Sequence, residues 1–128
     1  MRGYEYLKNK GYDDEYANIC LTYSYLNNDI VCTAGGVQNP KDNPFLTNFI
    51  KNHEYTIEEK LINLCDLMYP QGNKVFTIDK RLIYIMIRRG AYSNTQYHIK
   101  ETYKLKQYFD NLLEYNLYDL FPEIKENL

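Results

Sequence analysis

The sequence has no tryptophan, only two histidines and three cysteines, and no long run of apolar residues. A helix that crosses a bilayer needs about 20 consecutive apolar residues, so the sequence predicts no membrane span. The first ten residues also lack the apolar segment of a signal peptide. Cys20, Cys32 and Cys65 are widely spaced and odd in number, which favours free thiols in the cytoplasm over disulfides or a zinc site.

The chain also lacks an excess of positive charge, with 15 Lys and Arg against 17 Asp and Glu. Binding to nucleic-acid phosphates usually needs a basic surface, so no nucleic-acid partner is expected. Tyrosine is abundant instead, with 15 residues. This abundance fits either the codon usage of an AT-rich genome or a tyrosine-rich binding surface. The length of 128 residues suits a single domain with a modest core.

Apolar residues recur at helical spacing through the chain, and no segment alternates as a strand does. We therefore predict an all-α fold, a compact bundle of about six or seven helices. Helices are expected over residues 2–9, from 14 to about 26, over 45–52, 58–68, 78–89 and 95–115, with a final turn at 117–121. Residues 27–44 are expected to form a long loop, and the polar tail 123–128 is expected to fray.

Several local signals mark the helix ends. Thr56 and Glu59 have the spacing of a capping box, and Thr77 is a candidate N-cap. Pro44 suits a first helical position, and Gly90 suits the end of a helix. These signals predict the helix boundaries without reference to any known protein.

Two helices have recognisable apolar faces. The second helix places on one face Tyr16, Ile19, Cys20 and Tyr23, and the helix over 58–68 places on one face Ile57, Leu61, Leu64 and Met68. Cys20 and Cys65 are therefore expected to be packing residues. His53 is expected at a solvated helix end, and His98 on a polar helix without a chemical role. Gly35-Gly36 lacks the rest of a phosphate-loop motif and indicates a plain turn.

Three segments resemble one known family. They are residues 3–7 with 17–24, the stretch EKLINLCD at 59–66, and residues 77–82 with Arg88-Arg89-Gly90. Together they resemble the part of HD-domain proteins, a superfamily of predicted metal-dependent phosphohydrolases, that follows the His-Asp dyad. The resemblance implies an HD-like helical domain over residues 1–128 that lacks the first helices of the family. The early His and the dyad are expected before residue 1.

The resemblance also implies which residues belong to a site. Asp66 matches the late aspartate that binds metal in the family, and Tyr23 stands where relatives often have a histidine. A single carboxylate binds Mg²⁺ or Mn²⁺ weakly. No cofactor is therefore expected, and Mn, Mg or Fe is expected only if another chain supplies ligands. Arg81 and Arg88, together with Arg89, form a basic cluster that either lines the site to meet a phosphate or an acidic partner, or is a solvated face.

Three functions remain open at this point. The first is a relative of the HD-domain phosphohydrolases that is not catalytic by itself. The second is a non-enzymatic module or inhibitor, encoded by a phage or plasmid, that binds protein. The third is a plain structural domain. If the first helices of the family are absent, apolar surface near Ile19 and Leu64 is left bare. We then expect the chain to repack, to dimerise, or to bind a protein partner through that surface.

Overall fold

The computed structural model describes residues 2–23, 25–30, 41–70 and 74–128, and within these ranges it is all-α, as predicted. Loop features predicted at Cys32 and Gly35-Gly36 lie outside the described residues. The α-helices are α1 (Arg2–Asn9), α2 (Asp14–Thr22), α3 (Pro44–Asn52), α4 (Ile57–Met68), α5 (Ile78–Arg89) and α6 (Thr95–Leu113). The 3₁₀ helices are η1 (Leu26–Asn28), η2 (Leu117–Leu120) and η3 (Pro122–Asn127). None of the described helices has the length and apolar character needed to cross a membrane.

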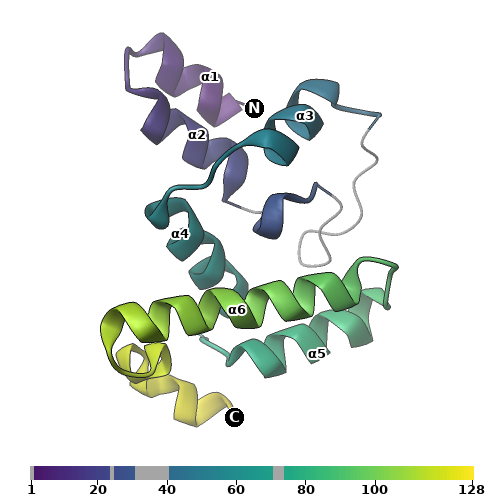
Figure 1. Ribbon diagram of the computed structural model, residues 1–128, viewed down its shortest axis with the longest axis vertical. Helices are drawn as coiled ribbons and strands as arrows, with labels where there is room; N and C mark the ends of the chain where they lie inside the picture. The colour runs from purple at the N-terminus through teal and green to yellow at the C-terminus, as the bar shows by residue number, and fades with distance from the viewer. Residues whose placement is uncertain (1, 24, 31–40, 71–73) are drawn as a thin grey trace.

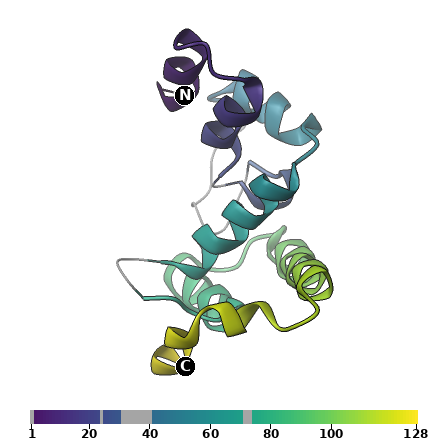
Figure 2. The same cartoon turned by 90° about the vertical axis from the view of Figure 1, so that its left-hand side faces the viewer.

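Helix α4 connects the two ends of the molecule. The α1–α2 pair lies at one end, and α5 and α6 lie side by side at the other (Figure 1). Turned by 90°, the molecule shows α4 between these two parts and the chain termini at opposite ends (Figure 2). Helix α4 contacts α2, α5, α6 and η1, so it touches elements that belong to both ends of the fold.

The predicted capping signals are confirmed. Thr56 and Glu59 form both halves of a capping box, with Glu59 N donating to Thr56 Oγ1 at 3.2 Å and Thr56 N donating to Glu59 Oε1 at 3.0 Å. Thr77 caps α5 by accepting a hydrogen bond from Lys80 N at 3.2 Å. Pro44 opens α3, and Gly90 ends α5 with a φ of 83°. These ends depend only on neighbouring residues, which is why the sequence predicts them well.

Two helix ends differ from the prediction. Helix α2 ends at Thr22 and does not reach Leu26, which begins η1. Asn27 and Asn28 there have φ values of 62° and 58°, in the left-handed region that ends a right-handed helix. Helix α6 stops at Leu113 because Glu114, its C-cap, is also left-handed with φ 63°.

The core consists of two clusters of buried apolar side chains. The larger cluster lies in the C-terminal half and contains Leu26, Leu64, Leu67, Met68, Val75, Ile78, Leu82, Ile85, Phe109, Leu117 and Ile124. The smaller cluster joins the N-terminal helices and contains Leu21, Ile30, Leu46 and Ile50. Residues of α4 enter only the larger of the two clusters.

The predicted apolar faces are only partly correct. On α2, Ala17 and Leu21 are buried, whereas Tyr16 and Tyr23 are exposed. Cys20 and Cys65 are half-buried free thiols. On α4, the chain itself fully buries Leu64, so the bare surface expected there is absent at that residue, and Ile19 is half-buried. In the first half of α4, the predicted apolar face points toward solvent and not into the core.

Ile57 and Leu61 on α4 remain 43% and 38% exposed. On the opposite side of the helix, Glu59 and Asn63 are each only 2% exposed. Helix α4 therefore buries polar side chains in its first half and apolar ones in its second half. Hydrogen-bond partners of Glu59 on other elements, Thr22 and His53, account for this orientation.

The C-terminal tail also differs from the prediction. Residues 123–127 belong to η3, and Ile124 is only 5% exposed within the larger core cluster. Asn127 Nδ2 donates to the carbonyl of Val75 at 3.3 Å, and Lys80 Nζ donates to the carbonyl of Asn127. One buried isoleucine and these polar contacts hold the tail on the fold, although its composition is mostly polar.

Candidate functional site

A basic pocket of about 460 Å³ opens beside the last turn of α4 and the outer side of α5. Its walls are Pro70, Lys74, Phe76, Arg81, Tyr84, Arg88 and Arg89. Helical spacing explains the gathering, because Arg81, Tyr84 and Arg88 recur three and four residues apart on α5. The pocket therefore combines four cationic side chains with two aromatic rings.

Arg81 is the most firmly held of these cations. Its Nε donates to the backbone carbonyl of Leu67 at 3.0 Å, near the C-terminal end of α4. Burial lowers the pKa of Arg81, the nearby Asp66 carboxylate opposes this, and Arg88 and Arg89 lower it further by repulsion. The guanidinium nevertheless remains charged at neutral pH. Its Nη groups are left for a ligand, since no hydrogen bond is formed by them within the described residues.

Asp66 lies near one of these cations, Arg81. Burial raises the pKa of its carboxyl group, and the positive charge of Arg81 partly opposes this rise. Within the described parts of the chain, Lys74, Arg81, Arg88 and Arg89 form no salt bridge shorter than 4 Å with an acidic side chain. The pocket thus keeps a net positive charge on a chain whose formal net charge is −2. Such a site attracts small anions.

Three of the four predicted site residues come together here, namely Asp66, Arg81 and Arg88. Tyr23 does not join them. It follows Thr22, which bonds to Glu59 in the first turn of α4, whereas Asp66 lies in the last part of that helix. Seven residues separate Glu59 from Asp66, or about 10 Å at a rise of about 1.5 Å per residue. Tyr23 is also 48% exposed.

The residues around Asp66 do not suit a bound divalent metal. No group of three or more His, Cys, Asp or Glu side chains with metal-binding geometry occurs within residues 2–23, 25–30, 41–70 and 74–128. The adjacent guanidinium of Arg81 would also repel a second cation at Asp66. A metal at this position would need further ligands from outside the described residues.

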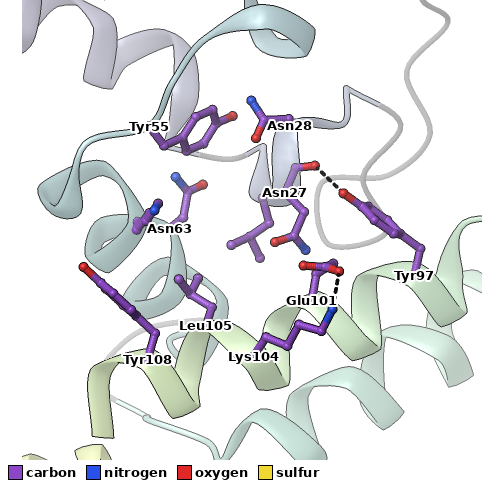
Figure 3. A pocket seen from close by; sticks show the side chains of 11 residues that line it. Asn27, Asn28, Tyr55, Asn63, Tyr97, Glu101, Lys104, Leu105 and Tyr108 are labelled. Carbon is purple, nitrogen blue, oxygen red and sulfur yellow. Dashed lines mark hydrogen bonds and ion pairs between the residues drawn. The ribbon is translucent and has the colours of Figure 1, made fainter. Parts of the chain in front are cut away.

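A second pocket, of about 320 Å³, lies between η1, α4 and α6, and we call it the amide pocket (Figure 3). Its walls are Leu26, Asn27, Asn28, Tyr55, Lys60, Asn63, Tyr97, Glu101, Lys104, Leu105 and Tyr108. Three tyrosine rings and two leucines make much of this wall, and three asparagines carry its amide groups. A volume of this size falls at the small end of ligand pockets, which span about 300–1,000 Å³.

The η1 side of the amide pocket is fixed by its own hydrogen bonds. Asn28 Nδ2 donates to the carbonyls of Ile50 at 2.9 Å and His53 at 2.7 Å. The carbonyl of Asn27 accepts from Tyr97 Oη at 3.1 Å, and the Asn27 Nδ2 lies 3.2 Å from His98 Nδ1. These bonds hold both asparagines in the left-handed conformation, which costs about 1–2 kcal/mol per residue.

Asn63 contributes the unusual group of this pocket. Its Nδ2 donates to the carbonyl of Glu59 at 2.7 Å, one turn back on α4. Its Oδ1 is buried and has no hydrogen-bond partner within residues 2–23, 25–30, 41–70 and 74–128. An unsatisfied buried acceptor of this kind costs about 1–3 kcal/mol. Figure 3 shows the Asn63 carboxamide facing the space between Tyr55, Asn27 and Leu105.

Glu59 occupies a polar junction next to the amide pocket. Its carboxylate accepts from Thr22 Oγ1 at 2.6 Å and from the Thr56 backbone N at 3.0 Å, and it lies 2.8 Å from His53 Nε2. Burial alone would raise the pKa of Glu59, but the hydrogen bonds from Thr22, Thr56 and His53 outweigh it, and the pKa is lowered. The junction ties α2, the end of α3 and α4 together.

Both histidines have structural partners that their sequence neighbours do not reveal. His53 is the C-cap of α3, and its ring stacks on Phe49 and bonds to Glu59. His98 is buried on α6, with Nε2 3.1 Å from Asp29 Oδ2. The sequence does not reveal the amide pocket, because the residues that line it come from four separate segments. The pair Asn27-Asn28 is the only local signal, since asparagine readily adopts the left-handed conformation.

Comparison of the chain with protein-family models, with curated proteins and with solved structures finds no match in any of the three. The relationship to HD-domain proteins therefore stays a prediction.

Proposed function

We propose that this chain binds a phosphorylated small molecule in the basic pocket and does not hydrolyse it. The observation that carries the proposal is the gathering of Lys74, Arg81, Arg88 and Arg89 around one pocket without acidic partners at salt-bridge distance in the described residues. The planar guanidinium groups suit phosphate oxygens, to which arginine can donate two parallel hydrogen bonds.

The walls suit an organic phosphate better than a bare ion. Phe76 and Tyr84 line the pocket beside the cations, with their ring centroids 6.4 Å apart. The backbone carbonyl of Leu67 orients Arg81 before any ligand arrives. Preorganised donors reduce the entropy that binding would otherwise lose. The volume of about 460 Å³ leaves room for a group attached to the phosphate.

The predicted relationship to HD-domain phosphohydrolases agrees with this ligand class, because those proteins act on phosphorylated substrates. We propose that the chain keeps the substrate preference without the chemistry. Hydrolysis of this kind needs several ligands to fix a metal and to activate water, and Asp66 is one carboxylate beside a cation. We also propose a reducing compartment such as the cytoplasm, since Cys20 and Cys65 are free thiols.

Binding is tested by titrating the purified chain with inorganic phosphate, pyrophosphate and phenyl phosphate, followed by NMR shifts of the arginine side chains. The shifts are expected at Arg81 and Arg88. The binding is expected to weaken when salt is added, because salt screens the attraction between the cations and phosphate. Arg88→Gln is expected to weaken binding about tenfold, the effect of losing about 1.4 kcal/mol. Arg2→Gln, the same change at an exposed arginine outside the pocket, is the matched control. Equal binding by both variants would refute the basic pocket as the site.

The absence of catalysis is tested separately with phenyl phosphate and Mn²⁺. No phosphate release above the rate without protein is expected. Release that depends on Mn²⁺ and disappears in Asp66→Ala would refute the non-catalytic proposal and support an active HD-type site. Calorimetry of Mn²⁺ with the wild-type chain and Asp66→Ala shows whether this carboxylate binds the metal at all.

A second candidate function, a protein-binding module that forms a homodimer, is favoured by one specific observation. Ile57 and Leu61 lie four residues apart on α4 and stay exposed, with Ile62 beside them. Exposed apolar residues that share a helix face often mark an interface. A second copy of this chain is the partner that we propose, because an isologous contact needs only one such face.

Light scattering over a range of protein concentrations tests this candidate. Leu61→Lys is expected to shift a dimer to monomer, while Ile87→Lys, a change at an exposed isoleucine on α5, is expected to leave the dimer intact. A monomer at all concentrations for the wild-type chain would refute the homodimer. The phosphate proposal does not depend on this outcome, since the basic pocket lies on α5 and not on the exposed face of α4.

A further inference from the structure

We propose that the amide pocket is a second binding site, independent of the basic pocket, for a small, neutral, planar heteroaromatic amine. The carboxamide oxygen of Asn63 is the group that selects this ligand. It is a buried acceptor on a residue that lines the cavity, it is fixed in orientation, and it has no hydrogen-bond partner among the residues that the structure describes. A ligand N–H group pointing at this oxygen would satisfy it.

The identity of the missing partner follows from the bond that Asn63 already makes. Its Nδ2 is held by the carbonyl of Glu59 at 2.7 Å, and rotation of the amide by 180° would set two oxygens against each other. Asn63 Oδ1 therefore presents only acceptor lone pairs to the pocket. On the opposite wall, Asn27 Nδ2 lies at 3.2 Å from His98, which turns the Asn27 oxygen away from His98 and toward the pocket (Figure 3). Two carbonyl oxygens facing one space favour a ligand that donates hydrogen bonds.

The remaining walls favour a flat ring. The rings of Tyr97 and Tyr108 line the pocket from α6 and that of Tyr55 from the segment before α4, and Leu26 and Leu105 form its apolar part. Aromatic side chains stack on the face of a planar heterocycle, and this stacking does not depend on which atoms make up the ring. Tyr55 and Tyr97 use their hydroxyl groups elsewhere, on the carbonyls of Tyr25 and Asn27, so their rings are held in place.

The charges at the rim favour a neutral ligand. Glu101 is paired with Lys104 at 3.1 Å, and Lys60 Nζ lies 5.5 Å from the centroid of the Tyr108 ring. Each charged side chain of the pocket therefore has a favourable partner already, so neither an anion nor a cation finds an uncompensated charge. This separates the amide pocket from the basic pocket, where none of the four cations has an acidic partner at salt-bridge distance within the described residues.

Adenine and purine form a matched pair of probes, because they differ only in the exocyclic amino group. Both are titrated into the ¹⁵N-labelled chain, and the side-chain amide signals of Asn63 and Asn27 are followed by NMR. Adenine is expected to shift the Asn63 signal and to bind about tenfold more tightly than purine, the difference that one hydrogen bond of about 1.4 kcal/mol produces. Equal binding of adenine and purine, or no shift at the solubility limit of adenine, would overturn the proposal.

Two variants test the roles of the walls. Asn63→Leu removes the acceptor and is expected to abolish the preference for adenine over purine, while the midpoint of unfolding stays equal or rises because an unsatisfied polar atom is removed. The Tyr108 side chain is partly exposed, so Tyr108→Ser is expected to fold. This variant is expected to weaken the binding of both probes to a similar degree. Asn111→Leu, the same change on the exposed side of α6, is the control. If Asn63→Leu still prefers adenine over purine, the assignment is overturned. If Asn63→Leu fails to fold, Tyr108→Ser still tests whether the probes bind in this pocket.

Discussion

Removing the Glu59 carboxylate is expected to destabilise the fold more than most single substitutions, because three donors from different segments converge on it. The distances to the Glu59 carboxylate are 2.6 Å from Thr22 Oγ1, 2.8 Å from His53 Nε2 and 3.0 Å from Thr56 N. Thr22 is the last residue of α2, His53 is the C-cap of α3, and Thr56 is the N-cap of α4. Glu59 and Thr22 are almost completely buried, so water does not replace these bonds easily. The perturbation is Glu59→Ala, compared with Thr22→Val, which removes only the hydroxyl.

The magnitude follows from these contacts. A hydrogen bond to a charged group contributes about 1.5–3 kcal/mol, so Thr22→Val is expected to cost about that amount. Glu59→Ala loses all three bonds, breaks one half of the capping box, and leaves the Thr22 hydroxyl buried without its partner. We expect a loss of about 3–5 kcal/mol, the range found when one member of a buried pair is removed. This is a large part of a typical domain stability of about 5–15 kcal/mol.

The assay is urea unfolding of the wild-type chain, both single variants and the double variant at pH 7. The double-mutant cycle isolates the interaction between Thr22 and Glu59, which is expected to be about 1–3 kcal/mol for residues in one network. Leu128→Ala, at a side chain that is 81% exposed, is the control and is expected to change little. Additive losses, with no interaction energy, would refute the junction as a source of stability.

The same junction predicts a pH dependence with a definite sign. The pKa of Glu59 is lower in the folded state than its ordinary value, so the folded chain binds the proton less readily than the unfolded chain. Its contribution is complete above the ordinary glutamate pKa of about 4.3 and disappears as the pH falls through the folded pKa. The stability lost between pH 7 and acidic pH is therefore expected to be smaller in Glu59→Gln than in the wild-type chain.

Three further predictions concern other parts of the fold. Asp79→Asn is expected to return the pKa of Tyr103 from about 12 toward its ordinary value, because the Tyr103 hydroxyl donates a hydrogen bond to the negatively charged Asp79 carboxylate, and NMR titration of the ring carbon measures this. Gly90→Ala is expected to cost about 1–2 kcal/mol in urea unfolding, since its φ is 83° although no atom would clash with a Cβ there. Ile124→Ala is expected to cost about 2–5 kcal/mol, and a loss near zero would show that the tail does not pack.

The sequence predicts the fold best where a boundary depends on neighbouring residues. The capping box at Thr56, the cap at Thr77 and the stop at Gly90 all involve atoms within a few residues of each other. It predicts the orientation of a helix less well where polar partners come from elsewhere. Glu59 is buried where it accepts a hydrogen bond from Thr22 at 2.6 Å. Thr22 is 37 residues away in the sequence, so local patterns do not predict this bond. Periodicity alone places Glu59 on the solvent side, and Leu61 in the core.

The candidate sites divide in the same way. Arg81 and Arg88 are seven residues apart on α5 and therefore share one face of the helix, so the sequence predicts that they cluster. Asp66 comes near Arg81 only because α4 packs on α5. The amide pocket is not readable in this way. Asn27 and Asn63 belong to different segments, and only the packing of η1 against α4 and α6 brings their oxygens to one cavity.

The position of the amide pocket follows from the division of the core. The larger cluster contains eleven buried apolar side chains and the smaller one contains four. Between them, α4 presents Glu59 and Asn63, and η1 presents the left-handed Asn27 and Asn28 beside the buried Leu26, so polar groups lie in the contact between the two halves. Polar groups at a junction must find partners, because a buried unpaired group is costly. Glu59 has its partners within the chain, whereas Asn63 Oδ1 has none among the described residues. The two residues lie one turn apart on the same helix, and the difference between them is why the first holds the fold together while the second is free to select a ligand.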